Sequence, residues 1–324
     1  MPRSIGQLWS KKKTSLVENP PFCGGNTLIC GKARTHLKVH LKRIIISSTP
    51  KMSLNQENNI HVPNFHLAQL IHEYDIVNRH GKINNEMMSS ILYLIKSESM
   101  ATFYESICKK FSWNFDKNLF DEMKVKNEKS ALSFDDKLKD LENHGGEIEI
   151  LDALFDKAKF WSLVGEFTLS SSAYDKIITR DKTSTARKID SWMGKARICL
   201  FEMNFSFLKD CITNLKALVE IGGDWDRRNR LKVYEALYHI TQREFHNAAK
   251  LLLDSVSTFA CDEICTYNQF MIYMVIANIM TLPRIDLFNK VVVNPQVISV
   301  IRLYHFTSFI ILIFFNAFFL EKFQ

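Results

Sequence analysis

The most constraining feature of this sequence is a long stretch without proline. No proline occurs between Pro63 and Pro283, and few glycines interrupt the stretch. Because proline breaks helices and glycine weakens them, a stretch of this length that is rich in helix-forming residues favours consecutive helices over strands. Apolar periodicity places the helices at 65–78, 84–96, 99–111, 116–143, 147–164, 168–180, 183–203, 207–220, 225–242, 246–259 and 263–281. The connections are short, so we expect antiparallel neighbours and an all-α fold.

A repeated pattern at three of the expected helix junctions indicates how these helices pair. The junctions start at Gly165, Ser206 and Arg243, which are 41 and 37 residues apart. In each, a bulky apolar residue follows the turn, a small residue stands five positions after the start, and a large residue stands nine positions after it. The small and large residues are Ser170 and Tyr174, Cys211 and Leu215, and Ala248 and Leu252.

This pattern is typical of tetratricopeptide-like helix pairs, in which the small residue lets two helices approach closely. We therefore predict a helical-hairpin solenoid over 145–282, preceded by an N-terminal helical region at 52–144. An ordinary irregular helical domain is the alternative.

Positive charge gathers in the first 51 residues. The chain of 324 residues carries a net charge of +7, yet residues 1–51 hold ten basic side chains and one acidic side chain. The remaining residues hold 32 basic and 34 acidic side chains, so the body is close to neutral. A long-range attraction to nucleic acid would depend on the leader alone, and we expect no nucleic-acid partner. We interpret 1–51 as a disordered basic extension, since Pro20-Pro21 and Gly24-Gly25 interrupt the helix that a mitochondrial transit peptide needs.

The end of the chain differs from the body in composition. Residues 303–320 contain no Asp, Glu, Lys or Arg. As a helix these residues would span about 27 Å, slightly less than the hydrocarbon core of a bilayer at about 30 Å. His305 and Asn316 weaken the interpretation as a membrane anchor. A buried helix or an aberrant terminus is therefore favoured over a membrane contact.

The cysteines indicate a reducing compartment. Seven cysteines are present, an odd number, and most are scattered in apolar surroundings. This pattern favours free thiols that pack as small apolar groups. Cys261 and Cys265 lie four positions apart, and we expect them to share a helix face and to pack in the core.

Local motifs for catalysis or metal binding fail on spacing. The glycines between Gly25 and Ala33 are too far apart for a phosphate loop, and the cysteines and histidines between Cys23 and His40 do not fit a zinc finger. His72-Glu73 begins like a zincin helix, but Ile76 stands where the second metal ligand is needed. We therefore predict no catalytic residue, no cofactor and no metal.

The most distinctive segment is 222–234, with the sequence Gly-Gly-Asp-Trp-Asp-Arg-Arg-Asn-Arg-Leu-Lys-Val-Tyr. Its two glycines can end one helix, and Asp224 can cap the next helix. The spacing also predicts ion pairs between Asp224 and Arg228 and between Asp226 and Arg230. We interpret the segment as a well-capped helix of the solenoid. The alternative is a protein–protein interface, because tryptophan and arginine often anchor interfaces; its residues would be Trp225, Arg227, Arg228 and Arg230.

The same segment closely resembles the central motif of a family of proteasome regulatory-particle lid subunits, the non-ATPase subunit 6 family. The similarity continues from Arg243-Glu244-Phe245 to residues 253–259, and weaker similarity reaches back to Met100 and Trp113. It covers residues 52–301 and is strongest at 214–260.

The resemblance implies a right-handed helical-repeat arm that leads into a PCI module, here incomplete. On this basis 283–324 is the start of a truncated PCI region with an apolar tail. The implied role is a non-catalytic scaffold in ubiquitin-dependent protein degradation, in cytoplasm and nucleus, with other lid subunits and the proteasome base and core as partners. A signalosome subunit of the same architecture, a membrane-anchored adaptor that uses 303–320, and an enzyme are the alternatives.

Overall fold

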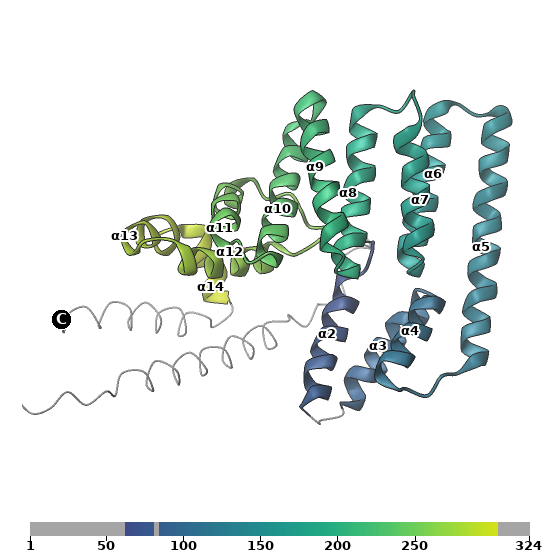
Figure 1. Ribbon diagram of the computed structural model, residues 1–324, viewed down its shortest axis with the longest axis horizontal. Helices are drawn as coiled ribbons and strands as arrows, with labels where there is room; N and C mark the ends of the chain where they lie inside the picture. The colour runs from purple at the N-terminus through teal and green to yellow at the C-terminus, as the bar shows by residue number, and fades with distance from the viewer. Residues whose placement is uncertain (1–61, 81–83, 304–324) are drawn as a thin grey trace, which may run out of the picture. The chain divides into compact units, whose positions relative to one another are not determined.

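The computed structural model describes residues 62–80 and 84–303 (Figure 1). The predicted basic extension at 1–51 and the apolar run after Leu303 lie outside these residues. Every regular element in the described ranges is a helix, which confirms the predicted all-α solenoid. No helix within those ranges is both long and apolar enough to cross a membrane.

Three helices and the start of a fourth form the first packed cluster of the described chain. Asn64 and Asn84 cap the first two of them, since each side chain accepts hydrogen bonds from backbone N–H groups of the first turn. Inside the cluster the Tyr74 ring meets the Trp113 ring edge-on at 5.2 Å, and the indole N–H of Trp113 donates to the Tyr74 hydroxyl at 3.1 Å. The elements are α2 (Phe65–Arg79), α3 (Asn85–Ser97), α4 (Ala101–Phe111) and α5 (Lys117–His144).

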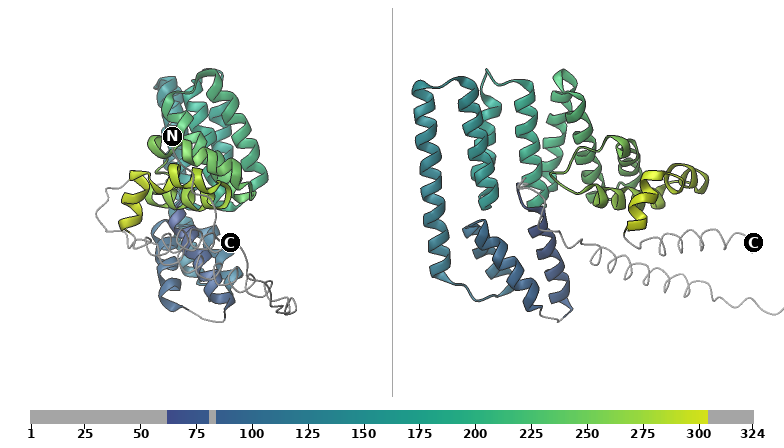
Figure 2. Two further views of the ribbon diagram at one scale, coloured as in Figure 1. Left: turned by 90° about the vertical axis from the view of Figure 1, so that its left-hand side faces the viewer. Right: turned by 180° about the vertical axis from the view of Figure 1, so that it is seen from behind.

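Antiparallel helix pairs follow α5. α6 packs against α7, α8 against α9 and α10 against α11, and α7 also packs against α8, so the pairs stack on one another (Figures 1 and 2). The helices are α6 (Glu147–Val164), α7 (Phe167–Thr179), α8 (Thr185–Glu202), α9 (Phe205–Gly222), α10 (Trp225–Thr241) and α11 (Phe245–Asp254). The buried positions predicted for the repeats, among them Ser170, Cys211 and Ala248, are fully enclosed between helices.

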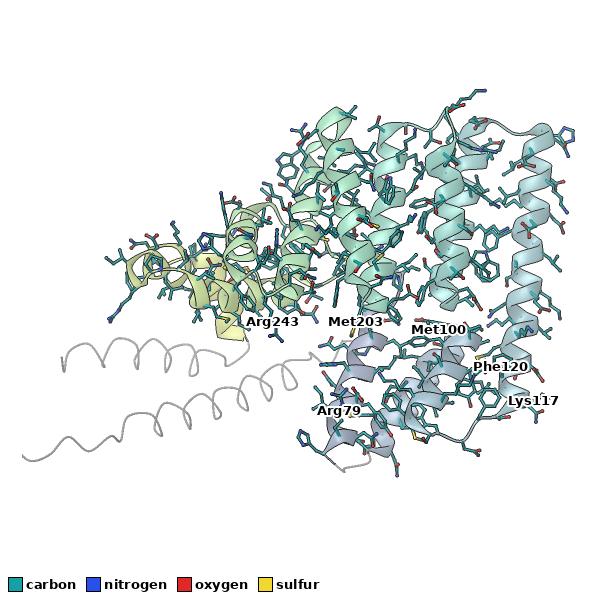
Figure 3. The ribbon with its side chains drawn as sticks, viewed as in Figure 1. Arg79, Met100, Lys117, Phe120, Met203 and Arg243 are labelled. Atoms are coloured by element: carbon teal, nitrogen blue, oxygen red, sulfur yellow. The ribbon has the colours of Figure 1, made fainter. Side chains whose placement is uncertain are left out.

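The pairs share a junction that ends α6, α8 and α10. Each of these helices is followed by a residue with positive φ, and the next helix begins two residues later with phenylalanine. The positive-φ residues are Gly165, Met203 and Arg243, and the phenylalanines are Phe167, Phe205 and Phe245. Figure 3 labels Met203 and Arg243.

The second junction, predicted at Ser206, is therefore placed three residues too late. The reason is local: the Asn204 side chain accepts the N–H of Phe207 at 3.3 Å and starts α9 before Ser206. The junctions that begin at Gly165 and Arg243 are as predicted.

Two predicted helices after α10 have different bounds in the structure. The helix predicted to reach 259 stops at Asp254, because the Ser255 hydroxyl donates to the Leu251 carbonyl at 2.8 Å and the chain tightens into a 3₁₀ turn, η1 (Val256–Thr258). The helix predicted from 263 begins only at α12 (Tyr267–Thr281), since Thr266 and Gln269 form a capping box there.

The late start of α12 corrects the prediction for Cys261 and Cys265. Both lie in the segment 259–266, which is not helical, and they do not share a helix face. Both are nonetheless buried as free thiols in the same apolar cluster, so the expected packing role holds.

The chain continues past α12 through short elements. These are α13 (Arg284–Leu287), a π-helical turn η2 (Phe288–Val292) and α14 (Pro295–Leu303). α12 packs against α11 and α14. It contains no charged residue, and its apolar residues are distributed all around the helix rather than along one face.

Candidate functional site

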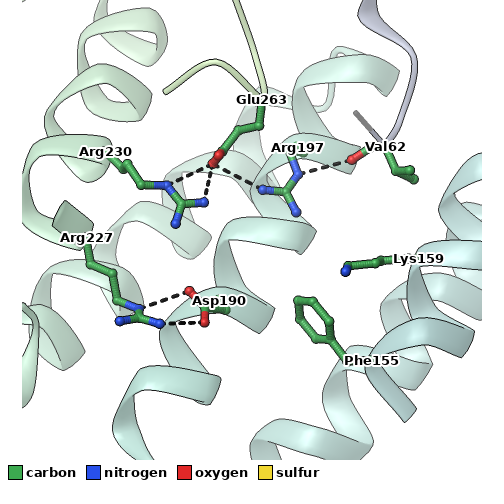
Figure 4. A pocket seen from close by; sticks show the side chains of 8 residues that line it. All are labelled: Val62, Phe155, Lys159, Asp190, Arg197, Arg227, Arg230 and Glu263. Atoms are coloured by element: carbon green, nitrogen blue, oxygen red, sulfur yellow. Dashed lines mark hydrogen bonds and ion pairs between the residues drawn. The ribbon is translucent and has the colours of Figure 1, made fainter. Parts of the chain in front are cut away.

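The site is built where the distinctive segment 222–234 meets α8 and the segment 259–266. Gly222 is the last residue of α9, and the side chain of Asp224 caps α10 by accepting the N–H of Arg227 at 3.0 Å. The predicted helix end and cap are thus confirmed. Arg227 and Arg230 lie one turn apart on α10 and extend toward α8 and the segment 259–266 (Figure 4).

Arg227 makes a paired contact with α8. Its Nε and Nη2 donate to the two carboxylate oxygens of Asp190 at 3.0 and 2.7 Å, while its Nη1 donates to Asp224 at 2.6 Å. The hydrogen bond to Asp190 and its negative charge raise the pKa of Arg227, although partial burial opposes this. A two-point contact of this kind fixes direction as well as distance, so it sets the register of α10 on α8.

Glu263 is the centre of a second contact, which we call the Glu263 cluster and define as Glu263, Arg197, Arg230 and Tyr234. One carboxylate oxygen of Glu263 accepts from Arg230 Nη2 at 2.6 Å and Nε at 3.2 Å. The same oxygen accepts from the Tyr234 hydroxyl at 2.8 Å and from Arg197 Nη1 at 3.2 Å. The cluster therefore joins α8, α10 and the non-helical segment before α12.

Arg197 extends this network to the first described residues of the chain. Its Nε donates to the Val62 carbonyl at 3.1 Å, and its Nη1 also donates to the Tyr234 hydroxyl at 3.1 Å. The side chain of Arg197 is only 11% exposed. Val62 and Arg197 are 135 positions apart in sequence, so this one side chain ties the segment before α2 to the repeats.

The charges of the Glu263 cluster support one another. Burial alone would raise the pKa of Glu263, but the positive charges of Arg197 and Arg230 hold it below its ordinary value. Burial would lower the pKa of Arg197, yet Tyr234 and Glu263 raise it. Burial is also the main reason that the pKa of Tyr234 stands well above its ordinary value. At neutral pH the cluster thus contains a carboxylate, two guanidinium groups and a neutral phenol.

These side chains border a pocket of about 330 Å³. Phe155 and Lys159 of α6 form its opposite wall, and the Lys159 ammonium lies 4.8 Å from the Phe155 ring centre (Figure 4). The full lining is Val62, Phe155, Lys159, Asp190, Arg197, Arg227, Arg230 and Glu263. It offers no serine, cysteine or histidine that could serve as a nucleophile or as a base near neutral pH. The arrangement is suited to holding helices together.

The structure divides the four residues predicted for a protein interface. Arg227 and Arg230 have side chains that are 21% and 18% exposed and are bound to carboxylates of the same chain. Trp225 is 65% exposed, and Arg228 is exposed with its Nε bound to the Gly223 carbonyl at 3.1 Å. Trp225 and Arg228 are thus available at the surface, where Ile221 is also 77% exposed.

One of the two predicted ion pairs of this segment is present. Arg230 approaches Asp226 at 3.7 Å, as predicted. Asp224 binds Arg227 rather than Arg228, so the pairing predicted for Arg228 is wrong. Asp224 caps the helix through the N–H of Arg227, and that contact brings its carboxylate beside the Arg227 guanidinium.

The partners of Arg227 and Arg230 were not predicted from the sequence. Asp190 and Glu263 lie 37 and 33 positions from these arginines, beyond any helical spacing. Arg197 offered a signal, because it stands in the otherwise apolar run Ala196-Arg197-Ile198-Cys199. A charged residue in such a run needs a buried partner, although the sequence of the run does not identify that partner.

The motifs tested for metal binding fall partly within the described ranges. His72 and Glu73 lie on α2, where Glu73 is buried and its burial raises the pKa of the carboxyl group. Among the described residues, no group of three or more His, Cys, Asp or Glu side chains could hold a metal ion. The segment from Cys23 to His40 lies outside them.

Fold and site together define a class: an α-helical repeat protein whose pairs are tied together by a buried ionic network. Comparison with known proteins identifies the family within this class. The family model described as 26S proteasome subunit RPN7 matches residues 116–290, from the cap of α5 to η2. This chain belongs to that family, which is of the PCI type, as the resemblance predicted.

Curated relatives agree with this assignment. The 26S proteasome non-ATPase regulatory subunit 6 homolog of Arabidopsis thaliana is 35% identical over 225 residues, which are 69% of this chain and 57% of that protein. The subunit 6 of Dictyostelium discoideum is 31% identical over 242 residues, 74% of this chain and 62% of that protein. The regulatory subunit RPN7 of Saccharomyces cerevisiae is 30% identical over 237 residues, 67% and 55% of the two chains. The chain therefore spans less than two thirds of the length of these relatives.

Proposed function

We propose that this chain is a non-catalytic scaffold subunit of the lid of the 26S proteasome regulatory particle and supports ubiquitin-dependent protein degradation. The observation that carries the proposal is the family match over 116–290, which coincides with the helices α5 to η2. The partners are other lid subunits and the proteasome base and core, and the location is cytoplasm and nucleus. The pocket chemistry supports a role without catalysis, since its two carboxylates are bound to arginines of the same chain.

The domain organisation forms part of this proposal. Residues 52–144 act as an N-terminal helical region, 145–282 act as the repeat arm, and 283–324 begin a PCI region. The helical pairs from α6 to α11 support the assignment of the arm. α13, η2 and α14 lie in the part that we assign to the start of that region.

The surface around the α9–α10 turn is the contact that we assign to a partner subunit. Trp225 and Arg228 are exposed there. Arg227 and Arg230 are partly buried and hold α10 against α8 and the segment 259–266. An exposed tryptophan beside an exposed arginine has the composition of an interface anchor.

Affinity purification of the tagged chain from cells tests the proposed role. We expect lid subunits of the proteasome to be recovered with it. Recovery of signalosome subunits in their place would assign the chain to the other complex, and recovery of neither would contradict the scaffold role.

A pair of variants tests the assigned surface in the same assay. Trp225→Ala combined with Arg228→Glu should reduce recovery of lid subunits without changing the unfolding midpoint. Tyr93→Ala is the matched control, since Tyr93 is 73% exposed on α3. Equal recovery of lid subunits with both variants would show that the α9–α10 turn is not part of the interface.

A further inference from the structure

One side of α12 is only partly covered within the described residues. Tyr273, Ile276 and Met280 follow one another at spacings of three and four, so they form a stripe along the helix. Tyr273 is 37% exposed and Met280 is 59% exposed, and Ile276 between them is half-buried. We call these three residues the α12 stripe. A helix that is apolar all around is expected to be covered on every side, so a stripe left open indicates a missing partner.

The elements after α12 leave further apolar side chains open. Ile285 is 76% exposed, Val293 54% and Phe288 49%. Single exposed apolar residues are ordinary, but here they follow the α12 stripe in the same short part of the chain. The part from α12 to α14 is thus richer in uncovered apolar surface than the repeats before it.

The chain itself supplies a segment of matching chemistry and length. Residues 304–320 follow α14 directly and contain no Asp, Glu, Lys or Arg. α14 packs against α12, so the described chain ends on an element that contacts the helix carrying the stripe. As a helix the seventeen residues would extend about 26 Å, whereas the fifteen residues of α12 extend about 22 Å. The segment is long enough to cover the whole stripe.

We propose that residues 304–320 dock on the α12 stripe and complete the apolar core at this end of the chain. Burial of Tyr273, Ile276 and Met280 against an uncharged segment removes apolar surface of both from water. The segment 1–51 is a poor alternative occupant, because its ten basic side chains would lose hydration on such a surface. The docking is a property of the chain alone and goes beyond its proposed role in a proteasome.

The change in dye fluorescence when residues 304–324 are removed tests the docking, because docked and exposed segments predict changes of opposite sign. The full chain and a chain ending at Leu303 are compared in the presence of anilinonaphthalene sulfonate, with helicity followed by circular dichroism. If the segment covers the stripe, its removal uncovers α12 and raises dye fluorescence at unchanged helicity per residue. If the segment is itself exposed, its removal takes away apolar surface and fluorescence falls, which overturns the proposal.

Photo-crosslinking in the full chain tests the contact directly. With p-benzoylphenylalanine in place of Met280, we expect a crosslink to residues 304–320 of the same molecule, independent of protein concentration. The same probe in place of Tyr93, on α3, is the matched control and should give no such product. Crosslinks only to a second copy, or none to 304–320, would overturn the proposal. So would flotation of the full chain, but not of the shortened chain, with phosphatidylcholine vesicles, because the segment would then be a membrane anchor.

Discussion

Two regions of the described chain solve the same packing problem in different ways. Around α8 and α10, buried charges are matched within the chain, and Glu263 alone accepts four hydrogen bonds from three side chains. From α12 to α14 the surface is apolar and partly open, with Met280 and Ile285 well exposed. The charges of the first region are thus completely matched within the described residues, whereas the second region, on our proposal, needs a cover.

Completeness of this kind carries a risk. A buried ionic network stabilises a fold only while every member is present, because removal of one member leaves its partner charged and unpaired in a poorly solvated place. An apolar stripe has no such dependence, and the loss of its cover exposes surface without stranding a charge. We therefore expect substitutions in the ionic network to lower the free energy of unfolding more than substitutions in the apolar region.

The largest expected effect comes from removing the centre of the ionic network. Glu263→Ala leaves Arg197 and Arg230 without their shared carboxylate, and we expect a loss of about 3 kcal/mol in the free energy of unfolding. Chemical denaturation measures this. Asp226→Ala is the matched control, since Asp226 also approaches Arg230 but is 53% exposed. It should cost under about 0.5 kcal/mol, and equal losses from both variants would contradict a special role for Glu263.

A smaller effect is expected from the removal of a single hydroxyl group. Tyr234→Phe keeps the ring in the core but removes the group that donates to Glu263 and accepts from Arg197. We expect a loss of about 1 kcal/mol in the free energy of unfolding, measured in the same way. Because the network is cooperative, the loss should shrink when Glu263 has already been replaced. Full additivity of the two substitutions would show that the contacts act independently.

The smallest expected effect is a dependence on pH. The pKa of Glu263 is lower in the folded chain than the ordinary glutamate value of 4.5. Its contribution to stability is therefore fully present above pH 4.5 and is lost as the pH falls through the lower folded value. Unfolding of the parent chain and of Glu263→Gln, measured from pH 7 downward, should give a stability difference that narrows only in this acid range. A difference that narrows at higher pH would contradict the assignment.

Sequence reasoning predicted the parts of this comparison that depend on neighbours in the chain. The end of α9 at Gly222 and the cap at Asp224 follow from glycine conformation and from helix-end hydrogen bonding, and both are local. The junctions at Gly165 and Arg243 were also predicted from the sequence. The helix start at Thr266 carried a capping-box signal that the apolar periodicity of the preceding residues concealed.

The rest could not be predicted because it depends on partners distant in sequence. Arg227 and Arg230 suggested an outward surface, and the structure turns both inward to Asp190 and Glu263. Nothing in the spacing of α10 identifies these partners, since they come from α8 and from a non-helical segment. Only Trp225 and Arg228 keep the surface position on which the interface prediction relied.

Hydrogen exchange of backbone amides tests most directly the claim that one region is complete and the other needs a cover. The full chain is compared with a chain that ends at Leu303, and protection is followed in α8, α10 and α12. We predict faster exchange in α12 of the shortened chain and unchanged exchange in α8 and α10. Unchanged protection of α12, or an equal loss of protection in all three helices, would contradict the account.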